Sequence, residues 1–247
     1  MTDLPADKLP RHLAIIMDGN GRWAQGQGML RTRGHAKGAE TIRTITTECA
    51  RLDLEQLTLY AFSHENWKRP KAEIAFLMRL LKKFLIDERP TLMDNNVRLT
   101  AIGRLDDLPD SARAELDATI AMTAGNSGLN LCLALSYGGR IELVDAARTL
   151  ASKVVAGEMS IEDIDEEAIS AHMYQPGPCP DLLVRTAGEM RISNFLLWQV
   201  SYSEIYVTAA CWPDFGLGEL NKALTNYAGR TRKYGGLVDP APEAMKG

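Results

Sequence analysis

An apolar segment that ends abruptly in a polar turn places the strongest constraint on how this chain folds. Residues 12–23 read HLAIIMDGNGRW, in which the apolar run 13–17 leads directly into Asp18. A short apolar run closed by a turn is typical of a buried strand in a parallel sheet. We therefore expect Asp18 to lie at the carboxyl end of a central strand.

The turn after this strand predicts a site for an anion and a cation together. Gly19 and Gly21 permit close approach of a ligand, and a helix beginning near Asn20 would direct free N–H groups toward it. Arg22 adds a positive charge. A carboxylate repels an anion in such a place unless a divalent cation bridges them. The turn therefore favours a diphosphate bound through a metal ion on Asp18.

Two other interpretations of this turn remain open. Residues 19–24, GNGRWA, match the G-x-G-x-x-A pattern of dinucleotide-binding folds, and Glu40 lies roughly where a ribose-binding acid would fall. Short glycine patterns are common, however, and the bulky Arg22 and Trp23 would crowd a pyrophosphate. Alternatively, Asp18 is simply the N-cap of the following helix. That interpretation accounts for the carboxylate but not for Arg22 and Trp23.

Several separated segments share the pattern of one known family. They are residues 12–24 (HLAIIMDGNGRWA), Arg31, Gly34-His35, residues 57–70 (LTLYAFSHENWKRP) and residues 191–199 (RISNFLLWQ). Together they closely resemble the cis-prenyltransferase family, which includes the bacterial undecaprenyl diphosphate synthases. The similarity extends from about Pro10 to Gly236, nearly the whole chain.

The resemblance implies a reaction and its setting. Members of this family are Mg²⁺-dependent enzymes that condense isopentenyl diphosphate repeatedly onto an allylic diphosphate such as farnesyl diphosphate. The expected product is a long-chain cis-polyprenyl diphosphate such as undecaprenyl diphosphate, the carrier-lipid precursor for cell-wall synthesis. An active homodimer in the cytoplasm is expected. A catalytically silent binding subunit is the alternative, but such a subunit would be expected to lack the DGNGRW segment.

The resemblance also implies roles for individual residues. Mg²⁺ is expected on Asp18 and Glu204. Asn66, with Ser63 nearby, is the candidate for assisting proton removal, and because a neutral amide is a poor base we expect it to orient a water or a diphosphate oxygen. The allylic diphosphate is expected to contact Gly19, Asn20, Gly21, Arg22, Arg31 and His35, with Trp23 against its first isoprene unit. The isopentenyl diphosphate is expected to contact Arg69, Arg185, Arg191 and Ser193. Further substrate contacts are expected from Ser63, His64, Glu65, Trp67 and Ile192.

Strand-like and helix-like patterns alternate along the chain. This alternation predicts a single α/β domain with a central, mostly parallel six-stranded sheet flanked by helices, which would bind ligands beyond the carboxyl edge of its strands. The helix expected at 71–87 has a broad apolar face, which is typical of core; by resemblance it also lines a hydrophobic tunnel for the growing chain. The further strands are expected at 56–63, 97–103, 129–136, 181–186 and 204–208, and amphipathic or apolar helices at 34–52, 71–87, 111–123 and 141–155.

Composition excludes several classes of function. A net charge of −4 argues against a general nucleic-acid binder, and no segment approaches the length of a membrane span. The four cysteines are scattered without a C-x-x-C pair, which favours reduced thiols in a cytosolic protein over zinc or disulfides. We expect one catalytic domain over residues 11–236, between a flexible N-terminus, 1–10, and a flexible C-terminal tail, 237–247.

An acidic motif competes for the role of metal site. Asp106 to Asp110 reads D-D-x-x-D, the metal-binding motif of trans-prenyltransferases. In that all-helical family two copies face each other, whereas this chain has one copy, in a loop with Pro109 near a helix start. We interpret it as capping and solvated charge.

The chain departs from the family pattern at three positions. Ser136 stands where an asparagine is usual, Ala187 where a glycine is usual, and Met190 where a histidine associated with the metal is usual. A histidine contribution to the metal is therefore in doubt. The basic segment 230–236 either reaches the site of a neighbouring subunit or ends a helix in solvent.

Overall fold

A six-stranded sheet forms the centre of the protein, and its strands follow the order β3-β4-β2-β1-β5-β6. The computed structural model describes residues 4–174 and 177–231. Every neighbouring pair of strands is parallel, so the expectation of a central parallel sheet is confirmed. The strands are β1 (His12–Ile16), β2 (Gln56–Ser63), β3 (Arg98–Ile102), β4 (Asn130–Tyr137), β5 (Leu182–Arg185) and β6 (Glu204–Val207).

The first strand is central because both of its faces are covered. β1 pairs with β2 on one side and with β5 on the other, and all five of its residues are buried. A strand buried on both faces has no need for alternating polar residues, which explains the unbroken apolar run in the sequence. The polar turn that follows it therefore lies in the middle of the carboxyl edge.

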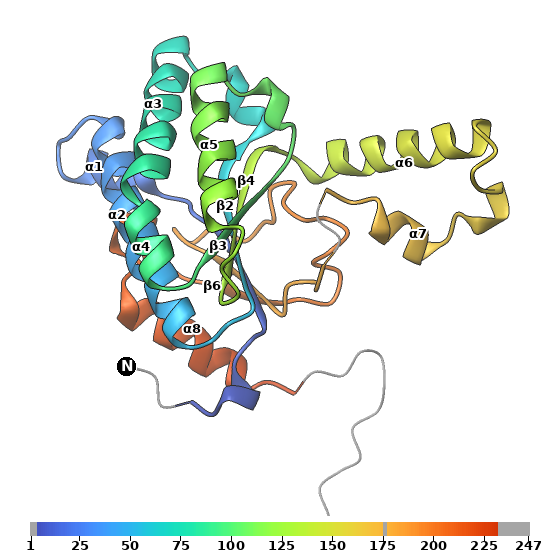
Figure 1. The fold of residues 1–247 in the computed structure, drawn as a ribbon. Coiled ribbons are helices and arrows are strands. Elements are labelled where there is room, and N and C mark those ends of the chain that lie inside the picture. Colours follow the sequence, from blue (N-terminus) through green and yellow to red (C-terminus); the bar gives the residue numbers. More distant parts are fainter. Residues whose placement is uncertain (1–3, 175–176, 232–247) are drawn as a thin grey trace, which may run out of the picture.

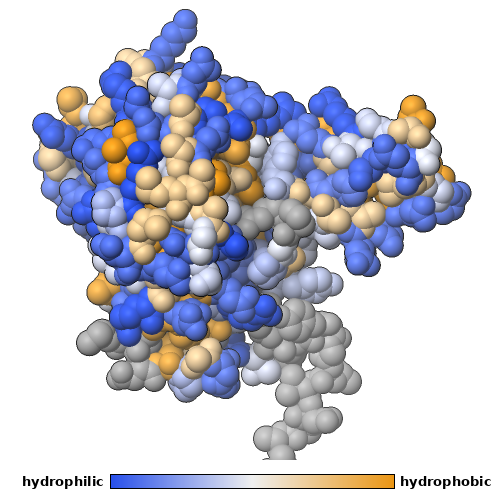
Figure 2. Space-filling model, in the orientation of Figure 1, coloured by the Kyte–Doolittle hydropathy of each residue, from blue (hydrophilic) through white to orange (hydrophobic). Residues whose placement is uncertain are grey.

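Helices cover one face of this sheet and an arm projects from its side. Helices α3 and α5 pack side by side, while α6 and α7 extend away from the rest of the molecule (Figure 1). Hydrophobic residues lie near the end of this arm (Figure 2), where the Val155 side chain is strongly exposed. The helices are α1 (Asn20–Gly26), α2 (Arg31–Arg51), α3 (Lys71–Asp87), α4 (Arg89–Asp94), α5 (Asp110–Thr123), α6 (Gly139–Val155), α7 (Glu166–Ala171) and α8 (Leu217–Ala228).

The two faces of the sheet support two cores of different composition. Large side chains such as Leu13 and Leu57 belong to the main core beneath the helices. The opposite face presents smaller side chains, including Ala14 and Ala134, to Phe195 and its neighbours in the segment after β5. That segment contains no helix, so a loop rather than a helix closes the second face. This loop also reaches the carboxyl edge of the sheet.

The ends of the chain are described only in part. Of the segment 1–10, which was expected to be flexible, residues 4–10 are described, and Leu4 and Leu9 pack against the main core. The expected tail 237–247 and the basic residues 232–236 lie outside the described residues. All four cysteines are free thiols, as expected. Within residues 4–174 and 177–231, no helix is long and apolar enough to cross a membrane.

Candidate active site

Asp18 lies where β1 ends, and the following glycine allows the chain to turn there. Gly19 has φ +95°, and a Cβ at this position would lie 2.7 Å from Ala187 Cβ and 2.9 Å from Cys211 Sγ. Only glycine combines this backbone conformation with such close packing. Gly19 is also the N-cap of α1 and makes no side-chain cap, so the alternative in which Asp18 is the N-cap is wrong.

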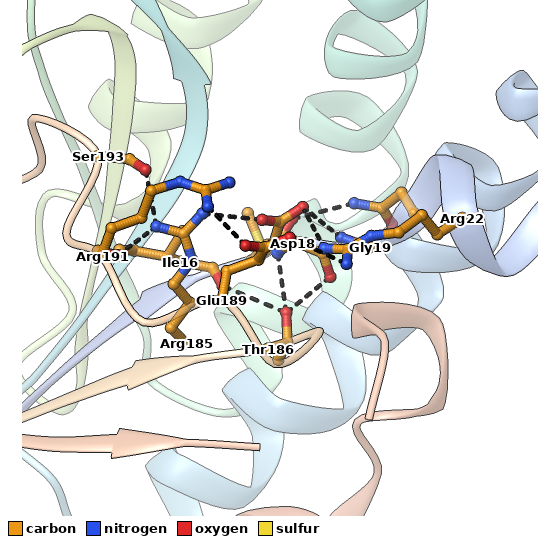
Figure 3. A network of polar contacts seen from close by, with 11 residues as sticks. Ile16, Asp18, Gly19, Arg22, Arg185, Thr186, Glu189, Arg191 and Ser193 are labelled. Atoms are coloured by element: carbon orange, nitrogen blue, oxygen red, sulfur yellow. Dashed lines mark hydrogen bonds and ion pairs between the residues drawn. The ribbon is translucent and has the colours of Figure 1, made fainter. Parts of the chain in front are cut away.

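The Asp18 carboxylate is surrounded by hydrogen-bond donors and cations. Its Oδ2 accepts from Arg185 Nη2 at 2.9 Å, its Oδ1 accepts from the Gly19 N–H at 2.6 Å, and Arg22 Nη2 lies 3.5 Å away (Figure 3). Burial raises the pKa of Asp18, but these donors outweigh burial, so the pKa falls below its ordinary value. The carboxylate is therefore ionised at neutral pH.

Arg185 supports the site from behind. Only 4% of this residue is exposed, and its Nη1 donates to Ser193 Oγ at 2.7 Å and to the Arg191 carbonyl oxygen. With its Nη2 on Asp18, the guanidinium is directed mainly at protein acceptors. Arg185 therefore holds Asp18, and with Ser193 it holds the neighbouring loop. Arg185 and Ser193 had instead been expected to contact isopentenyl diphosphate directly.

Glu189 is a site residue that the sequence analysis missed. Its carboxylate bridges two exposed arginines, with Oε1 3.1 Å from Arg22 Nη1 and Oε2 2.5 Å from Arg191 Nη1 (Figure 3). Both arginines were expected to bind diphosphates, and Glu189 holds their guanidinium groups in place. The role of Glu189 could not be read from the sequence, because the segments that carry Arg22 and Arg191 are far apart in the chain and meet only in the folded protein.

These residues line a polar cleft that opens at the carboxyl edge of the sheet. The cleft encloses about 730 Å³ of space between protein atoms, open solvent at its mouth included. It brings together all of the residues that were expected to contact the allylic diphosphate directly. The lining residues are Met17, Asp18, Gly19, Asn20, Gly21, Arg22, Arg31, His35, Arg69, Glu189 and Arg191.

Small residues allow α1 and α2 to approach closely beside this cleft. A Cβ on Gly21 would lie 2.7 Å from Arg31 Cζ, and one on Gly34 would lie 1.9 Å from the Asn20 carbonyl oxygen. α2 begins at Arg31 rather than at Gly34, so His35 lies in its second turn and not at its start. The expected helix start was wrong by one turn, but the same residues face the cleft.

His35 faces the cleft as a neutral imidazole. Burial and the nearby charges of Arg69 and Arg31 lower the pKa of His35 to about 4. Its buried Nε2 and the buried Oδ1 of Asn20 have no hydrogen-bond partner. Buried polar atoms are usually satisfied, so two such atoms at one place indicate that a ligand completes the site.

An apolar pocket adjoins the polar cleft. It encloses about 870 Å³ between α2, α3 and the ends of β2 and β4, with open solvent at its mouth included. Met17, Asn20, His35 and Arg69 line both spaces, so the two adjoin at these residues. The remaining lining is Gly38, Ala39, Ile42, Tyr60, Ala61, Phe62, Asn66, Leu77, Met78, Leu80, Leu81, Phe84, Leu133, Leu135 and Trp212.

The segment after β2 forms a short 3-10 helix, His64–Lys68, at the boundary of the pocket. Ser63 and Asn66 cap each other, and Asn66 Oδ1 accepts from the Ser63 N–H at 3.2 Å. This capping orients the Asn66 amide where it lines the pocket. Glu65 accepts from Asn194 Nδ2 at 2.7 Å, and therefore ties this segment to the loop after β5. His64 lies near Asp107, outside both linings.

Glu204 does not lie beside Asp18. It is the first residue of β6, whereas Asp18 follows the last residue of β1. In the parallel register Glu204 pairs with Leu182, three residues and roughly 10 Å of strand before the edge that carries Asp18. Glu204 Oε2 is instead 2.5 Å from Arg230 Nη1. Within one chain Glu204 therefore does not join Asp18, and its role as a ligand of Mg²⁺ stays a prediction.

Several other expected contacts also lie outside the linings of the cleft and the pocket: Trp23, Ser63, Glu65, Trp67, Arg185, Ile192 and Ser193. Trp23 Nε1 donates to Asp214 Oδ1 at 2.8 Å, which holds the indole beside the segment after β6. Ile192 packs against the core on the second face of the sheet. Neither residue lines the polar cleft or the apolar pocket.

The acidic motif does not assemble a metal site. Asp106 pairs with Arg113 at 2.7 Å, and Asp107 accepts from Ser136 Oγ at the same distance. Within the described part of the chain, no three side chains of histidine, cysteine, aspartate or glutamate form a cluster that could hold a metal. The interpretation of the motif as capping and surface charge holds for Asp106, while Asp107 has a buried partner.

Mg²⁺ fits the residues around Asp18 when a diphosphate accompanies it. Mg²⁺ prefers oxygen ligands and is commonly bound through one or two carboxylates together with substrate phosphates, so a large protein cluster is not required. Asp18 offers an ionised carboxylate that lines the cleft, and its side chain is 31% exposed. The donor set therefore suits a cation shared between Asp18 and a bound diphosphate.

The departures from the family pattern have structural consequences. Ala187 and Ser136 have φ +68° and +45°, the left-handed region that glycine or asparagine tolerates best. The usual glycine and asparagine are explained by these conformations. The Met190 side chain is strongly exposed. A thioether is a poor ligand for Mg²⁺, so oxygen ligands remain the basis of the site.

Comparison with known proteins agrees with this geometry. Residues 16–235 match the family described as "Putative undecaprenyl diphosphate synthase". The isoprenyl transferase of Geobacter sulfurreducens is 50% identical over 236 residues, covering 95% of this chain and 96% of that protein. The isoprenyl transferase of Rhodopirellula baltica is 49% identical over 240 residues, covering 96% of this chain and 98% of its own.

Solved structures show the same fold. Lavandulyl diphosphate synthase from Lavandula x intermedia, in complex with dimethylallyl diphosphate, has a TM-score of 0.91 and 37% identity, covering 93% of this chain and 99% of that one. A probable undecaprenyl diphosphate synthase from Campylobacter jejuni has a TM-score of 0.76 and 34% identity, covering 92% of this chain and 98% of its own. The chain belongs to the undecaprenyl diphosphate synthase family of cis-prenyltransferases.

Proposed function

We propose that this prenyltransferase condenses isopentenyl diphosphate repeatedly onto an allylic diphosphate, with farnesyl diphosphate as the primer, to make undecaprenyl diphosphate. The observation that carries the proposal is that the polar cleft adjoins the apolar pocket and shares four lining residues with it. A molecule with a diphosphate at one end and a hydrocarbon tail at the other matches these two spaces. Among the relatives, lavandulyl diphosphate synthase is described in complex with an allylic diphosphate.

The allylic diphosphate binds at the start of α1 in this proposal. Asn20 and Gly21 offer backbone N–H groups there beside Gly19, whose own N–H is held by Asp18, and Arg22 and Arg31 offer charge. Arginine suits diphosphate oxygens because its planar fork donates two parallel hydrogen bonds. His35 contributes a hydrogen bond rather than a charge, since its imidazole is neutral.

Asp18 would hold Mg²⁺ together with the diphosphate, and the ion would supply stabilisation of the negative charge on the leaving group. Asp18 itself stays anionic because Arg185 and the Gly19 N–H stabilise the carboxylate. Glu189 holds Arg22 and Arg191, so that in this proposal Arg22 faces the allylic diphosphate and Arg191 the isopentenyl diphosphate.

Isopentenyl diphosphate binds at Arg69 and Arg191, which also line the cleft. A carbon–carbon bond forms to the allylic carbon as its diphosphate leaves, and a proton is lost from the isopentenyl unit to create the cis double bond. Asn66 lines the pocket and has no basic nitrogen, so it orients the acceptor. The acceptor is an oxygen of the departing diphosphate, which leaves with the proton.

The biological setting forms part of the proposal. Undecaprenyl diphosphate is the carrier-lipid precursor for cell-wall synthesis, and both substrates are small water-soluble diphosphates of the cytoplasm. We infer a homodimer, because β6 is the edge strand of the sheet and presents the half-exposed Ile205. A second copy is also required if Glu204 is to approach a metal ion, since it cannot reach the Asp18 of its own chain.

The test is to incubate the purified protein with farnesyl diphosphate, radiolabelled isopentenyl diphosphate and Mg²⁺, and to separate the extracted products by chain length. A ladder that ends at the undecaprenyl length and disappears with EDTA is expected. A shorter final product would keep the chemistry and overturn the carrier-lipid assignment. Absence of product from a folded protein would contradict the proposal and favour a catalytically silent subunit.

A further inference from the structure

A chain of side-chain hydrogen bonds connects the acidic motif to the segment that carries Asn66 and Arg69. Trp67 Nε1 donates to Ser136 Oγ at 2.9 Å, and Ser136 Oγ donates to Asp107 Oδ2 at 2.7 Å. The direction of both bonds is fixed by chemistry. An indole N–H only donates, so the single hydroxyl hydrogen of Ser136 is directed to the carboxylate.

Ser136 occupies an unusual backbone position at the end of β4. Its φ is +45° and its side chain is completely buried. An asparagine, the usual residue of the family here, tolerates this conformation and could accept from Trp67 with its own amide oxygen. A serine has only a rotating hydroxyl, whose orientation depends on a further acceptor. Asp107 supplies that acceptor.

The loop that carries Asp107 is itself fixed in place. Asp107 is the last residue of the 3-10 turn Leu105–Asp107, and Leu108 directly after it is buried in the main core. Its neighbour Asp106 makes a surface ion pair with Arg113. Of the two adjacent aspartates, only Asp107 is therefore directed at a buried group.

Trp67 lies between the two residues that matter for the reaction. The indole packs edge-on against Phe62, with ring centroids 4.9 Å apart, and Phe62 lines the apolar pocket. The Arg69 N–H donates to the Asn66 carbonyl oxygen at 3.0 Å, so the segment turns as a unit around Trp67. A rotation of the indole would therefore displace both Asn66 and Arg69.

We propose that Asp107 is a positioning residue which, through Ser136, fixes Trp67 and so aligns Asn66 and Arg69 toward isopentenyl diphosphate. The inference rests on the proposed function, in which those two residues face that substrate. An asparagine at position 136 would orient Trp67 directly. In this chain Asp107, which belongs to the acidic motif, does so through the Ser136 hydroxyl.

The test compares Asp107→Ala with the control Asp106→Ala, which removes a neighbouring surface carboxylate. Loss of one hydrogen bond within a positioning network predicts a rise in KM for isopentenyl diphosphate of about 3- to 10-fold. The KM for the allylic diphosphate is expected to change less than about twofold, since that site lies at α1. Asp107→Asn, which keeps an acceptor oxygen, is expected to behave nearly as the unaltered protein.

A second background makes the test specific to the hydrogen-bond chain. In Ser136→Asn the amide accepts from Trp67 directly, so Asp107→Ala is expected to have little further effect there. Should Asp107→Ala fail to fold, Ser136→Gly removes the hydroxyl at a conformation that glycine favours, and the same selective rise in KM is expected. Equal effects of Asp107→Ala in the unaltered protein and in the Ser136→Asn variant would overturn the proposal.

Tryptophan fluorescence separates this inference from the proposed function. Asp107→Ala is expected to alter the emission spectrum, and this difference should vanish when Trp67→Phe is present. The measurement needs no substrate, so it remains decisive if the protein makes no polyprenyl product. An emission spectrum of Asp107→Ala that is identical to those of Asp106→Ala and the unaltered protein would contradict the role of Asp107.

Discussion

The polar cleft and the apolar pocket adjoin, but different interactions build them. In the cleft, charged groups fix one another: Asp18 is held by Arg185, and Glu189 bridges two exposed arginines. Its residues come from a strand end, a helix start and a loop with several left-handed residues. In the pocket, apolar side chains project from regular elements, chiefly α2 and α3.

This difference indicates how each region responds to change. A buried or half-buried charge that loses its partner costs several kcal/mol, so the cleft tolerates few substitutions. Apolar walls accept changes of volume at much smaller cost when empty space adjoins them. We therefore expect the cleft to determine whether the reaction occurs and the pocket to determine how long the product grows.

The largest effect is expected from Asp18→Asn, which keeps the shape and an acceptor for Arg185 but removes the charge. Turnover should fall at least about 10³-fold, on the order of 4 kcal/mol of transition-state stabilisation. KM for isopentenyl diphosphate should change much less, because Arg69 and Arg191 remain. Steady-state kinetics checks this, with circular dichroism to confirm folding; equal losses in turnover and isopentenyl diphosphate binding would contradict the role of Asp18.

His35, at the junction of the two regions, and the buried His12 should make the fold sensitive to acid. The pKa of each is lowered to about 4, mainly by burial, while an unfolded histidine titrates near 6.5. The unfolded chain therefore binds more protons between these values. The free energy of unfolding is therefore highest above pH 6.5 and decreases as the pH falls toward 4. At pH 5 the loss is roughly 2 kcal/mol for each histidine.

Urea unfolding at pH 7.5 and pH 5.0 measures this loss. His35→Asn should remove about half of the pH dependence attributable to the two histidines, and His12→Asn the other half, since both have similar pKa values. An unchanged pH dependence in both variants would show that neither histidine is neutral in the folded protein.

A bulky residue in the pocket should shorten the product with little loss of rate. Ala39 lines the pocket from α2, and Ala39→Phe places a ring in existing space. Total isopentenyl incorporation should change by less than about threefold, because the cleft is intact. The matched control is Ala75→Phe, at an exposed position of α3. Product ladders of unchanged length in both variants would remove the pocket from chain-length control.

The smallest effect is expected in the loop that forms one wall of the cleft. Ala187 has φ +68°, which is strained for alanine, so Ala187→Gly should stabilise the protein by about 0.5 kcal/mol despite the added freedom of the unfolded chain. Ala209→Gly, at an exposed position without positive φ, should destabilise it by a similar amount. Thermal unfolding of both variants checks the opposite signs.

The sheet and much of the cleft could be predicted from the sequence. All six strands were expected in the sequence, and the apolar runs are clearest for β1, β4 and β5, because strands buried on both faces need no polar alternation. Parallel strands end at one edge, so Asp18, the segment after β2 and Arg191 were expected there together. For these residues the family motif and the sheet topology predicted the same position, at the carboxyl edge of the sheet.

The sequence could not reveal interactions between segments of irregular structure. The loop after β5 covers the second face of the sheet through Phe195, and its course depends on left-handed residues such as Ser193 and Asn194. Because the path of this loop could not be predicted, neither the bridging role of Glu189 nor the burial of Arg185 could be predicted. Glu204 is different: as a strand-start residue it belonged at the opposite edge, and only the family resemblance associated it with Asp18.

The central claim is that one molecule spans both regions, with its diphosphate in the cleft and its tail in the pocket. A crystal structure of the protein with Mg²⁺ and the unreactive analogue farnesyl thiodiphosphate tests this claim most directly. The account predicts diphosphate oxygens against Asp18, Arg22 and Arg31 and a hydrocarbon tail passing His35 between α2 and α3. A tail that lies outside the pocket, with the diphosphate elsewhere on the sheet edge, would contradict it.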